Sequence, residues 1–234
     1  MKSIEGSALN ITQDSVELYV SSEKTLEYPD DVRDYQKPGT GVWTIEHCKA
    51  DRIESIVECT LETVIRSDDP RWLHVKDPTI HRIPNGDTLL GFVTHPFNWT
   101  SSNTAYRLKP SGIGWNPPVY DFFRRGYAWD VAISRATAWL NVPRVGEFID
   151  NPQTLIFYDG GESIQDLEEH KEAVKRPRGY SCEELGGLAV ADETGIGGIM
   201  RLSVNKPLFV SPMGTGCSRY VDVLEVEEGY YATW

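Results

Sequence analysis

The chain has 234 residues, of which 40% are hydrophobic, so it is long enough to bury a substantial core. Asp and Glu number 35 against 23 Lys and Arg, and the resulting formal charge of -12 makes nucleic acid or an anionic membrane an unfavourable partner. A neutral ligand is expected instead. The N-terminal residues lack a signal-peptide pattern and no apolar run approaches bilayer length, which predicts a cytoplasmic location and no membrane partner.

The four cysteines, Cys48, Cys59, Cys182 and Cys217, show no CxxC spacing. Their pattern indicates neither a zinc site nor a disulfide framework, and free structural thiols are expected. No other motif requires a metal ion or a cofactor, so the prediction is that there is none. The oligomeric state is not predicted by the sequence.

Strand signals recur along the whole chain. Residues 8–22 hold two β-rich runs around a Gln-Asp turn, and residues 78–95 hold two more around Pro-Asn-Gly-Asp. The same pattern returns in residues 131–143 with 153–161, and in residues 219–234, where Glu227, Glu228 and Gly229 make the turn. Four similar units are therefore predicted, at about residues 7–67, 73–126, 127–205 and 206–234.

Helical signals are scarce. Residues 163–176 are the one convincing candidate, with mixed charges and Pro177 to end the helix, and they are interpreted as an insertion between strands. An all-β chain of short strand pairs is compatible with a sandwich, a barrel or a β-propeller. Because a whole strand-pair unit recurs, we expect a single β-propeller domain over residues 1–234.

Three acidic residues are evenly spaced. Asp77, Asp130 and Glu183 are each separated by 53 residues, about the length of one four-stranded blade, and each is expected just before a strand pair. The first strands of successive blades line the central channel of a propeller. These acids, with Glu184 as an alternative to Glu183, are therefore expected to face one axial pocket, at least two carboxyl groups lying within about 10 Å.

A ring of carboxyl groups suits glycoside cleavage, which needs one acid to protonate the leaving oxygen and one carboxylate to activate water or attack the sugar. Neighbouring like charges raise the pKa of one partner and keep it protonated. Sugar sites also use aromatic faces and planar donors. The candidate ligand-binding residues are Lys76, His95, Trp129, Arg135, Tyr158, Asp159, Arg219 and Tyr220.

Structural roles compete with this interpretation. A carboxylate at a strand start often accepts backbone N–H bonds to complete a turn, so each acid taken singly has a structural explanation. His74, His81 and His95 surround one strand pair, but without a further ligand they indicate structural histidines and not a metal site.

The segments "VKDPTIH", "WDVAISRATAWLNVP", "CEELGGLAVA" and "SRYVDVL" resemble five-bladed β-propeller glycoside hydrolases of the family 43 and family 32 type. The most specific match is Lys76-Asp77-Pro78, which resembles the central Asp-Pro motif of those enzymes. By that resemblance, Asp77 would stabilise the transition state or tune the pKa of the acid.

The sequence departs from the pattern of those enzymes in two places. The position one blade after Asp77 holds Asp130 where those enzymes carry a Glu general acid, so that role would pass to Asp130, Glu183 or Glu184. The blade that supplies the first acid is not evident before residue 16, which implies either an incomplete propeller or an unusual ring closure.

Three functions follow as expectations. The first is a glycoside hydrolase-like protein that cleaves an oligo- or polysaccharide by carboxylate chemistry. The second is a carbohydrate-binding or structural propeller that lacks the first catalytic acid, and the third is a repeat scaffold with no sugar ligand.

Overall fold

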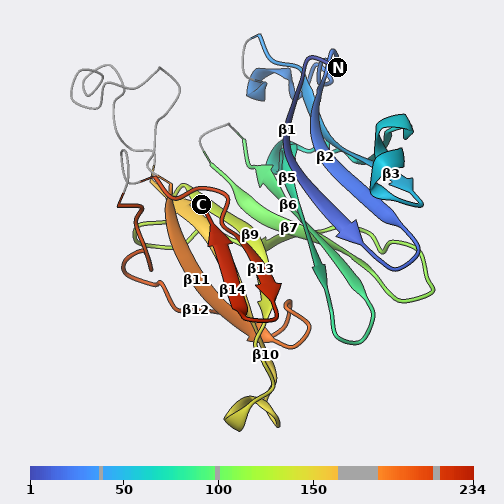
Figure 1. Ribbon diagram of the computed structural model, residues 1–234. Coiled ribbons are helices and arrows are strands. Elements are labelled where there is room, and N and C mark those ends of the chain that lie inside the picture. Colours follow the sequence, from blue (N-terminus) through green and yellow to red (C-terminus); the bar gives the residue numbers. More distant parts are fainter. Residues whose placement is uncertain (37–38, 98–100, 163–183, 213–216) are drawn as a thin grey trace. The chain divides into compact units, whose positions relative to one another are not determined.

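The computed structural model of the protein describes residues 1–36, 39–97, 101–162, 184–212 and 217–234 (Figure 1). The chain forms two compact units. Unit 1 comprises residues 1–99 and 103–122, and unit 2 comprises residues 100–102 and 123–234. The expected helix at residues 163–176 and the candidate acid Glu183 lie outside the described residues.

The described residues are mostly β-strand, which confirms the coarse all-β prediction. The strands are β1 (Ser3–Ile11), β2 (Val16–Lys24), β3 (Val42–Ala50), β4 (Glu62–Ile65), β5 (Leu73–Arg82), β6 (Thr88–His95), β7 (Asn103–Lys109), β8 (Val119–Phe123), β9 (Ile133–Asn141), β10 (Gln153–Gly161), β11 (Leu185–Asp192), β12 (Met200–Arg201), β13 (Asp222–Val226) and β14 (Gly229–Thr233). Four 3₁₀ helices accompany them: η1 (Arg33–Tyr35), η2 (Ile53–Glu58), η3 (Pro70–Trp72) and η4 (Gly146–Phe148). In the described ranges, no helix has the length and apolar character needed to span a bilayer.

The strands form antiparallel sheets that follow chain order. Three sheets have four strands each, in the orders β1-β2-β3-β4, β5-β6-β7-β8 and β12-β11-β10-β9, and β13 pairs with β14 in a two-stranded sheet. All four hairpins expected from the sequence are confirmed by the strand pairings. The short or irregular strands β4, β8 and β12 were not foreseen, because each is too brief to show a clear alternation.

One local expectation was wrong. The sequence placed Asp77 just before a strand, but β5 begins at Leu73 and Asp77 lies inside it. The ladder with β6 pairs Lys76 with Val93 and Thr79 with Gly91, and so passes over Asp77 and Pro78. Pro78 has no N–H to donate to a ladder, which is why the strand accommodates it at an irregularity of the pairing.

The core of unit 1 lies between its two sheets. Apolar side chains that alternate along the central strands form one buried cluster: Tyr19, Ile45, Ile65, Val75, Leu90, Phe92 and Ala105. A second, smaller cluster consists of Tyr28, Val32, Val42 and Leu73. Strand β5 contributes to both clusters, since Val75 belongs to the first and Leu73 to the second. It is therefore the strand through which the two sheets of unit 1 pack.

In unit 2, a large ring fills the space over a glycine of the neighbouring strand. Tyr158 on β10 is fully buried, and its register partner on β11 is Gly187. A Cβ atom at Gly187 would lie 2.3 Å from the Tyr158 ring, closer than any real contact. Glycine at position 187 is thus required by packing, because an aromatic ring from β10 occupies the place of the side chain.

This packing predicts that Gly187→Ala lowers the free energy of unfolding by about 1–3 kcal/mol, the usual cost of overpacking a core. Gly114→Ala is the matched control, because nothing lies within 4 Å of a Cβ added at Gly114. Urea denaturation of both variants measures the difference. Equal stabilities for the two would contradict the assignment of Tyr158 to this contact.

Candidate functional site

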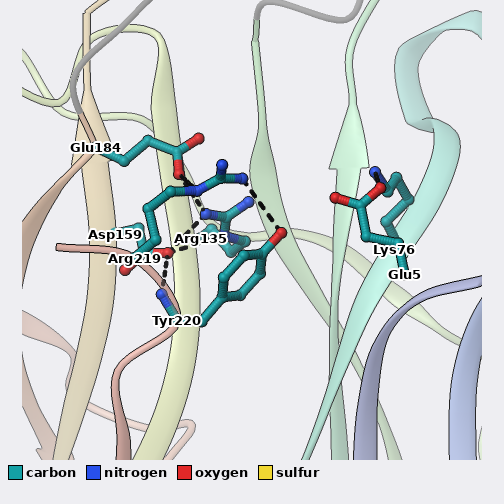
Figure 2. Close-up of polar contacts among 7 residues, drawn as sticks. All are labelled: Glu5, Lys76, Arg135, Asp159, Glu184, Arg219 and Tyr220. Carbon is teal, nitrogen blue, oxygen red and sulfur yellow. Dashed lines mark hydrogen bonds and ion pairs between the residues drawn. The ribbon is translucent and has the colours of Figure 1, made fainter. Parts of the chain in front are cut away.

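Five side chains gather at one end of the sheets of unit 2. Arg135 lies on β9, Asp159 on β10, Glu184 directly before β11, and Arg219 with Tyr220 shortly before β13 (Figure 2). The strand register explains part of the grouping, because Asp159 is paired with Arg135 on one side and with Gly186 on the other. We call these five residues the Asp159 cluster.

Arg135 links the two carboxyl groups of the cluster. Its Nη2 atom donates to Asp159 Oδ2 and to Glu184 Oε2, both at 2.7 Å, and its Nε donates to Asp159 Oδ2 at 3.1 Å. Two oxygens bonded to the same nitrogen are separated by no more than twice that distance. The carboxyl groups are therefore close neighbours, joined by a guanidinium that neutralises part of their charge.

The segment before β13 completes the cluster. The backbone N–H of Tyr220 donates to Asp159 Oδ2 at 3.0 Å, and the guanidinium of Arg219 forms an ion pair with Glu184. Arg219 Nη2 donates to the Tyr220 hydroxyl at 3.3 Å, and the guanidiniums of Arg135 and Arg219 lie 4.3 and 5.0 Å from the Tyr220 ring centre. Cation–π contacts to two guanidiniums therefore help to fix the ring.

The exposed fraction of the side chains increases across the cluster. Asp159 is fully buried, Arg135 and Glu184 are nearly so, and Tyr220 is 38% exposed. Burial raises the pKa of Asp159, and the nearby Glu184 carboxylate adds to this, against the opposing effects of Arg135 and the Tyr220 N–H. Burial is the largest single effect on the pKa of Arg219 and lowers it, but the Glu184 charge, together with Tyr220 and Cys217, raises the pKa overall.

Asp130 belongs to a different group of side chains in unit 2. It is fully buried, and its Oδ2 accepts from Arg201 Nε at 3.0 Å and from the Tyr158 hydroxyl at 3.3 Å. Tyr158 and Asp159 are consecutive on β10, so their side chains point to opposite faces of the sheet. Asp130 is therefore not part of the Asp159 cluster, and its catalytic role stays a prediction.

Trp129 is held in the same group as Asp130. Its ring stacks on Tyr158 at 5.6 Å, and its Nε1 donates to the carbonyl oxygen of Ser203 at 2.8 Å. Arg201 donates to Ser134 Oγ at 2.9 Å and to the carbonyl of Arg124. These contacts connect the loop before β9 with β12 and the residues that follow it. Trp129 and Tyr158, which the sequence analysis assigned to ligand binding, therefore make structural contacts here.

Lys76 forms a second polar group, in unit 1. Its Nζ donates to Glu5 Oε2 at 2.6 Å (Figure 2). The same Nζ lies 4.3 Å from the centre of the Trp43 ring. Lys76 is 7% exposed, whereas the Glu5 side chain is 44% exposed. The sequence did not single out Glu5 or Trp43, since nothing in the local pattern of β1 or β3 shows which strand lies next to β5.

Asp77 is also nearly buried, at 7% exposure, and its backbone N–H donates to Ser21 Oγ at 2.7 Å. Its backbone is left-handed, with φ at 49°. Asp77 lies in unit 1 and Glu184 in unit 2, so the convergence of the predicted acids on one axis stays a prediction, as do the catalytic roles assigned to these residues.

His95, a predicted ligand-binding residue, lies beside His74 in unit 1. Its Nδ1 is 2.8 Å from the carbonyl oxygen of His74, whose backbone N–H donates to the Tyr28 hydroxyl at 3.0 Å. His74 is completely buried and His95 is 8% exposed. The contacts of His74 are those of a core residue, in agreement with the structural interpretation of that histidine, and the ligand-binding role of His95 stays a prediction.

Comparison with known proteins gives a likeness of structure alone. No protein-family model matches the sequence, and no curated protein matches it. Among solved structures, a mutant of the GH43 protein BlXynB from Bacillus licheniformis is similar with a TM-score of 0.58 at 10% identity, over 98% of this chain and 36% of that one. The xylan β-1,4-xylosidase from Bacillus halodurans C-125 is similar with a TM-score of 0.58 at 13% identity, over the same shares of the two chains.

These likenesses confirm the resemblance to family 43 glycoside hydrolases, as a resemblance of fold. The chain spans about a third of the length of both solved structures.

The buried histidines make stability depend on pH. Burial lowers the pKa of His74 and His81 to about 4, against about 6.5 in an unfolded chain. The folded protein then binds fewer protons than the unfolded chain between these values, so stability is complete above pH 6.5 and is lost as the pH falls towards 4. We expect the loss to be about 3 kcal/mol for each histidine.

His81→Gln is expected to flatten this dependence, because burial alone lowers the pKa of His81. Urea denaturation of the wild type and the variant at about pH 7, 6 and 5, the range between the unfolded and folded pKa values, measures the slopes. Parallel slopes for the two proteins would show that His81 does not titrate in this range.

Proposed function

We propose that this protein is a glycoside hydrolase-like β-propeller that cleaves glycosidic bonds of a neutral oligo- or polysaccharide by carboxylate acid-base chemistry. The observation that carries the proposal is the carboxyl pair of Asp159 and Glu184, held at one end of the sheets of unit 2. The fold likeness to family 43 enzymes supports the same class of reaction.

The two carboxyl groups of the pair are close enough to act on one sugar linkage. Each of the two oxygens is 2.7 Å from Arg135 Nη2, so their separation does not exceed twice that distance. Retaining glycosidases place their two carboxyl groups about 5–5.5 Å apart. Burial raises the pKa of Asp159 above its usual range, and the Arg135 guanidinium and the Tyr220 N–H oppose that rise.

We assign different roles to the members of the cluster. Glu184 forms an ion pair with Arg219, the more exposed of the two arginines in the cluster. We therefore assign Glu184 as the acid that contacts the ligand. Arg219 and Tyr220 supply a planar donor and an aromatic face, which are the groups that bind sugar hydroxyls and sugar rings. Asp77 lies in unit 1 and is not a member of the cluster; a supporting catalytic role is proposed for it from its resemblance to the Asp-Pro motif alone.

The test is hydrolysis of a panel of arylglycosides and oligosaccharides by the purified protein. Glu184→Gln is expected to lower kcat by about 10²–10⁴-fold, the usual contribution of an acid-base group. Asp77→Asn is also expected to lower kcat, because a supporting acid stabilises the transition state or tunes the pKa of the acid. Glu193→Gln is the matched control, because Glu193 is an exposed residue whose ion pair with Arg144 contributes little.

Three results would contradict the proposal. Equal turnover by wild type and Glu184→Gln would remove Glu184 from the chemistry, and equal turnover by Asp77→Asn would remove Asp77. Failure of the wild type to hydrolyse every glycoside in the panel would reject the hydrolase.

A second candidate function is carbohydrate binding without cleavage. It is favoured by the position of Arg135, which bonds both carboxyl groups and lies between them where a reacting group would have to enter. Arg219 adds a second positive charge beside Glu184. This candidate predicts that a sugar raises Tm by linkage to the folded state while no product forms. Arg219→Ala is expected to remove that shift.

The arrangement of the sheets and the cellular location are part of the proposal. We assign the four sheets to blades of a five-bladed type of propeller, an assignment that a crystal structure with sheets not arranged around one axis would reject. A cytoplasmic location is proposed from the cysteine spacing of the sequence, which indicates no disulfide framework. Cell fractionation that recovers the protein outside the cytoplasm would reject it.

A further inference from the structure

The backbone at Asp77 is held in an unusual conformation. Its φ of 49° lies in the left-handed region, which a residue with a side chain rarely adopts and which carries a conformational cost. Such a residue persists only where its surroundings hold it, and residues of this kind concentrate at functional sites. The contacts of Asp77 within unit 1 show what holds it.

Two irregular strands meet at this residue. The pairing of β5 with β6 is irregular between Lys76 and Thr79, at Asp77 itself. The pairing of β1 with β2 is irregular between Glu5 and Ser7, at Gly6. Bulges of this kind bend a strand and redirect a side chain, and they are common beside active sites.

Gly6 provides the space into which Asp77 fits. A Cβ atom added to Gly6 would lie 2.8 Å from Asp77 Oδ1 and 3.2 Å from Asp77 Cα. Gly6 itself has a φ of +66°, a conformation that glycine adopts without cost. Both the space and the backbone angle therefore require glycine at this position of β1.

Ser21 on β2 supplies the bond that holds the backbone. Its Oγ accepts from the Asp77 N–H at 2.7 Å, and it would also lie 3.5 Å from a Cβ at Gly6. Ser21 is completely buried, so this bond is shielded from water. Asp77 has passed out of the β5–β6 ladder, and Ser21 gives its N–H a partner that the ladder does not provide.

We propose that Gly6 and Ser21 are positioning residues that hold Asp77 in its left-handed conformation and so orient its carboxyl group for the supporting role proposed for it above. Ser21 acts by accepting the Asp77 N–H, and Gly6 by leaving room for the Asp77 carboxyl and Cα. The kinetic part of this inference rests on the proposed hydrolase function, whereas the conformational part does not.

The conformational part is tested by thermal unfolding without any substrate. Asp77→Gly removes the cost of the left-handed backbone and is expected to raise Tm by about 2–4 °C. Gly6→Ala is expected to lower Tm in the wild type and to lower it less in the Asp77→Gly background, because the clash with Oδ1 is then absent. A lower Tm for Asp77→Gly, or an equal effect of Gly6→Ala in both backgrounds, would overturn the inference.

The kinetic part uses Ser21→Ala, with Ser22→Ala as the matched control, since Ser22 is the equally buried neighbour on β2. Misplacement of Asp77 is expected to lower kcat by about 10- to 100-fold with KM nearly unchanged, and Ser21→Thr, which keeps the hydroxyl, is expected to restore activity. Equal losses for Ser21→Ala and Ser22→Ala would overturn the inference. A wild type without turnover would reject the proposed function, and the Tm measurements would then decide the inference alone.

Discussion

One carboxylate oxygen, Asp159 Oδ2, connects the elements that form the candidate site in unit 2. Asp159 Oδ2 accepts two hydrogen bonds from Arg135 and one from the backbone of Tyr220. A fully buried carboxyl group is costly unless it is paired in this way, so these bonds compensate for its burial. They also connect β9, β10 and the segment before β13, and Arg135 extends the connection to Glu184. The site therefore depends on this one buried oxygen to connect elements that strand pairing brings side by side.

Unit 1 depends on a different constraint, which is the close approach of two bulged strands. Asp77 is not paired in the β5–β6 ladder. Its carboxyl group fills the space next to Gly6, and its backbone N–H donates to Ser21 Oγ. Tyr220 in unit 2 is also left-handed, with a φ of 55°. In both units, then, a candidate site residue has an unfavourable backbone angle and a buried polar partner for its N–H, which is the form that local strain takes at functional sites.

The strand pairs could be predicted from the sequence because they are local. Alternation of apolar residues and turn residues such as Asn85-Gly86 act over a few positions, and they placed all four hairpins. The outer strands of the sheets are harder to predict. Strands β4 and β12 are short, and they are stabilised by pairing with a neighbouring strand more than by their own sequence pattern. The position of Asp77 was misplaced for a related reason, since a bulge is a property of a strand pair.

The sequence by itself determined the all-β fold through its repeated hairpins, and the motifs around Asp77, Arg135 and Glu184 pointed to the resemblance of fold to family 43 enzymes. Only the tertiary structure decided which of those residues meet. Tyr158, which bonds Asp130, and Asp159, which shares Arg135 with Glu184, are consecutive on β10, so their side chains point to opposite faces and the two groups are separate. The tertiary structure also brought Glu5, Gly6 and Ser21 to β5 from strands far away in the chain. The physical reason is that patterns of burial act over a few residues, whereas the partners of a buried charge are chosen by strand order and register.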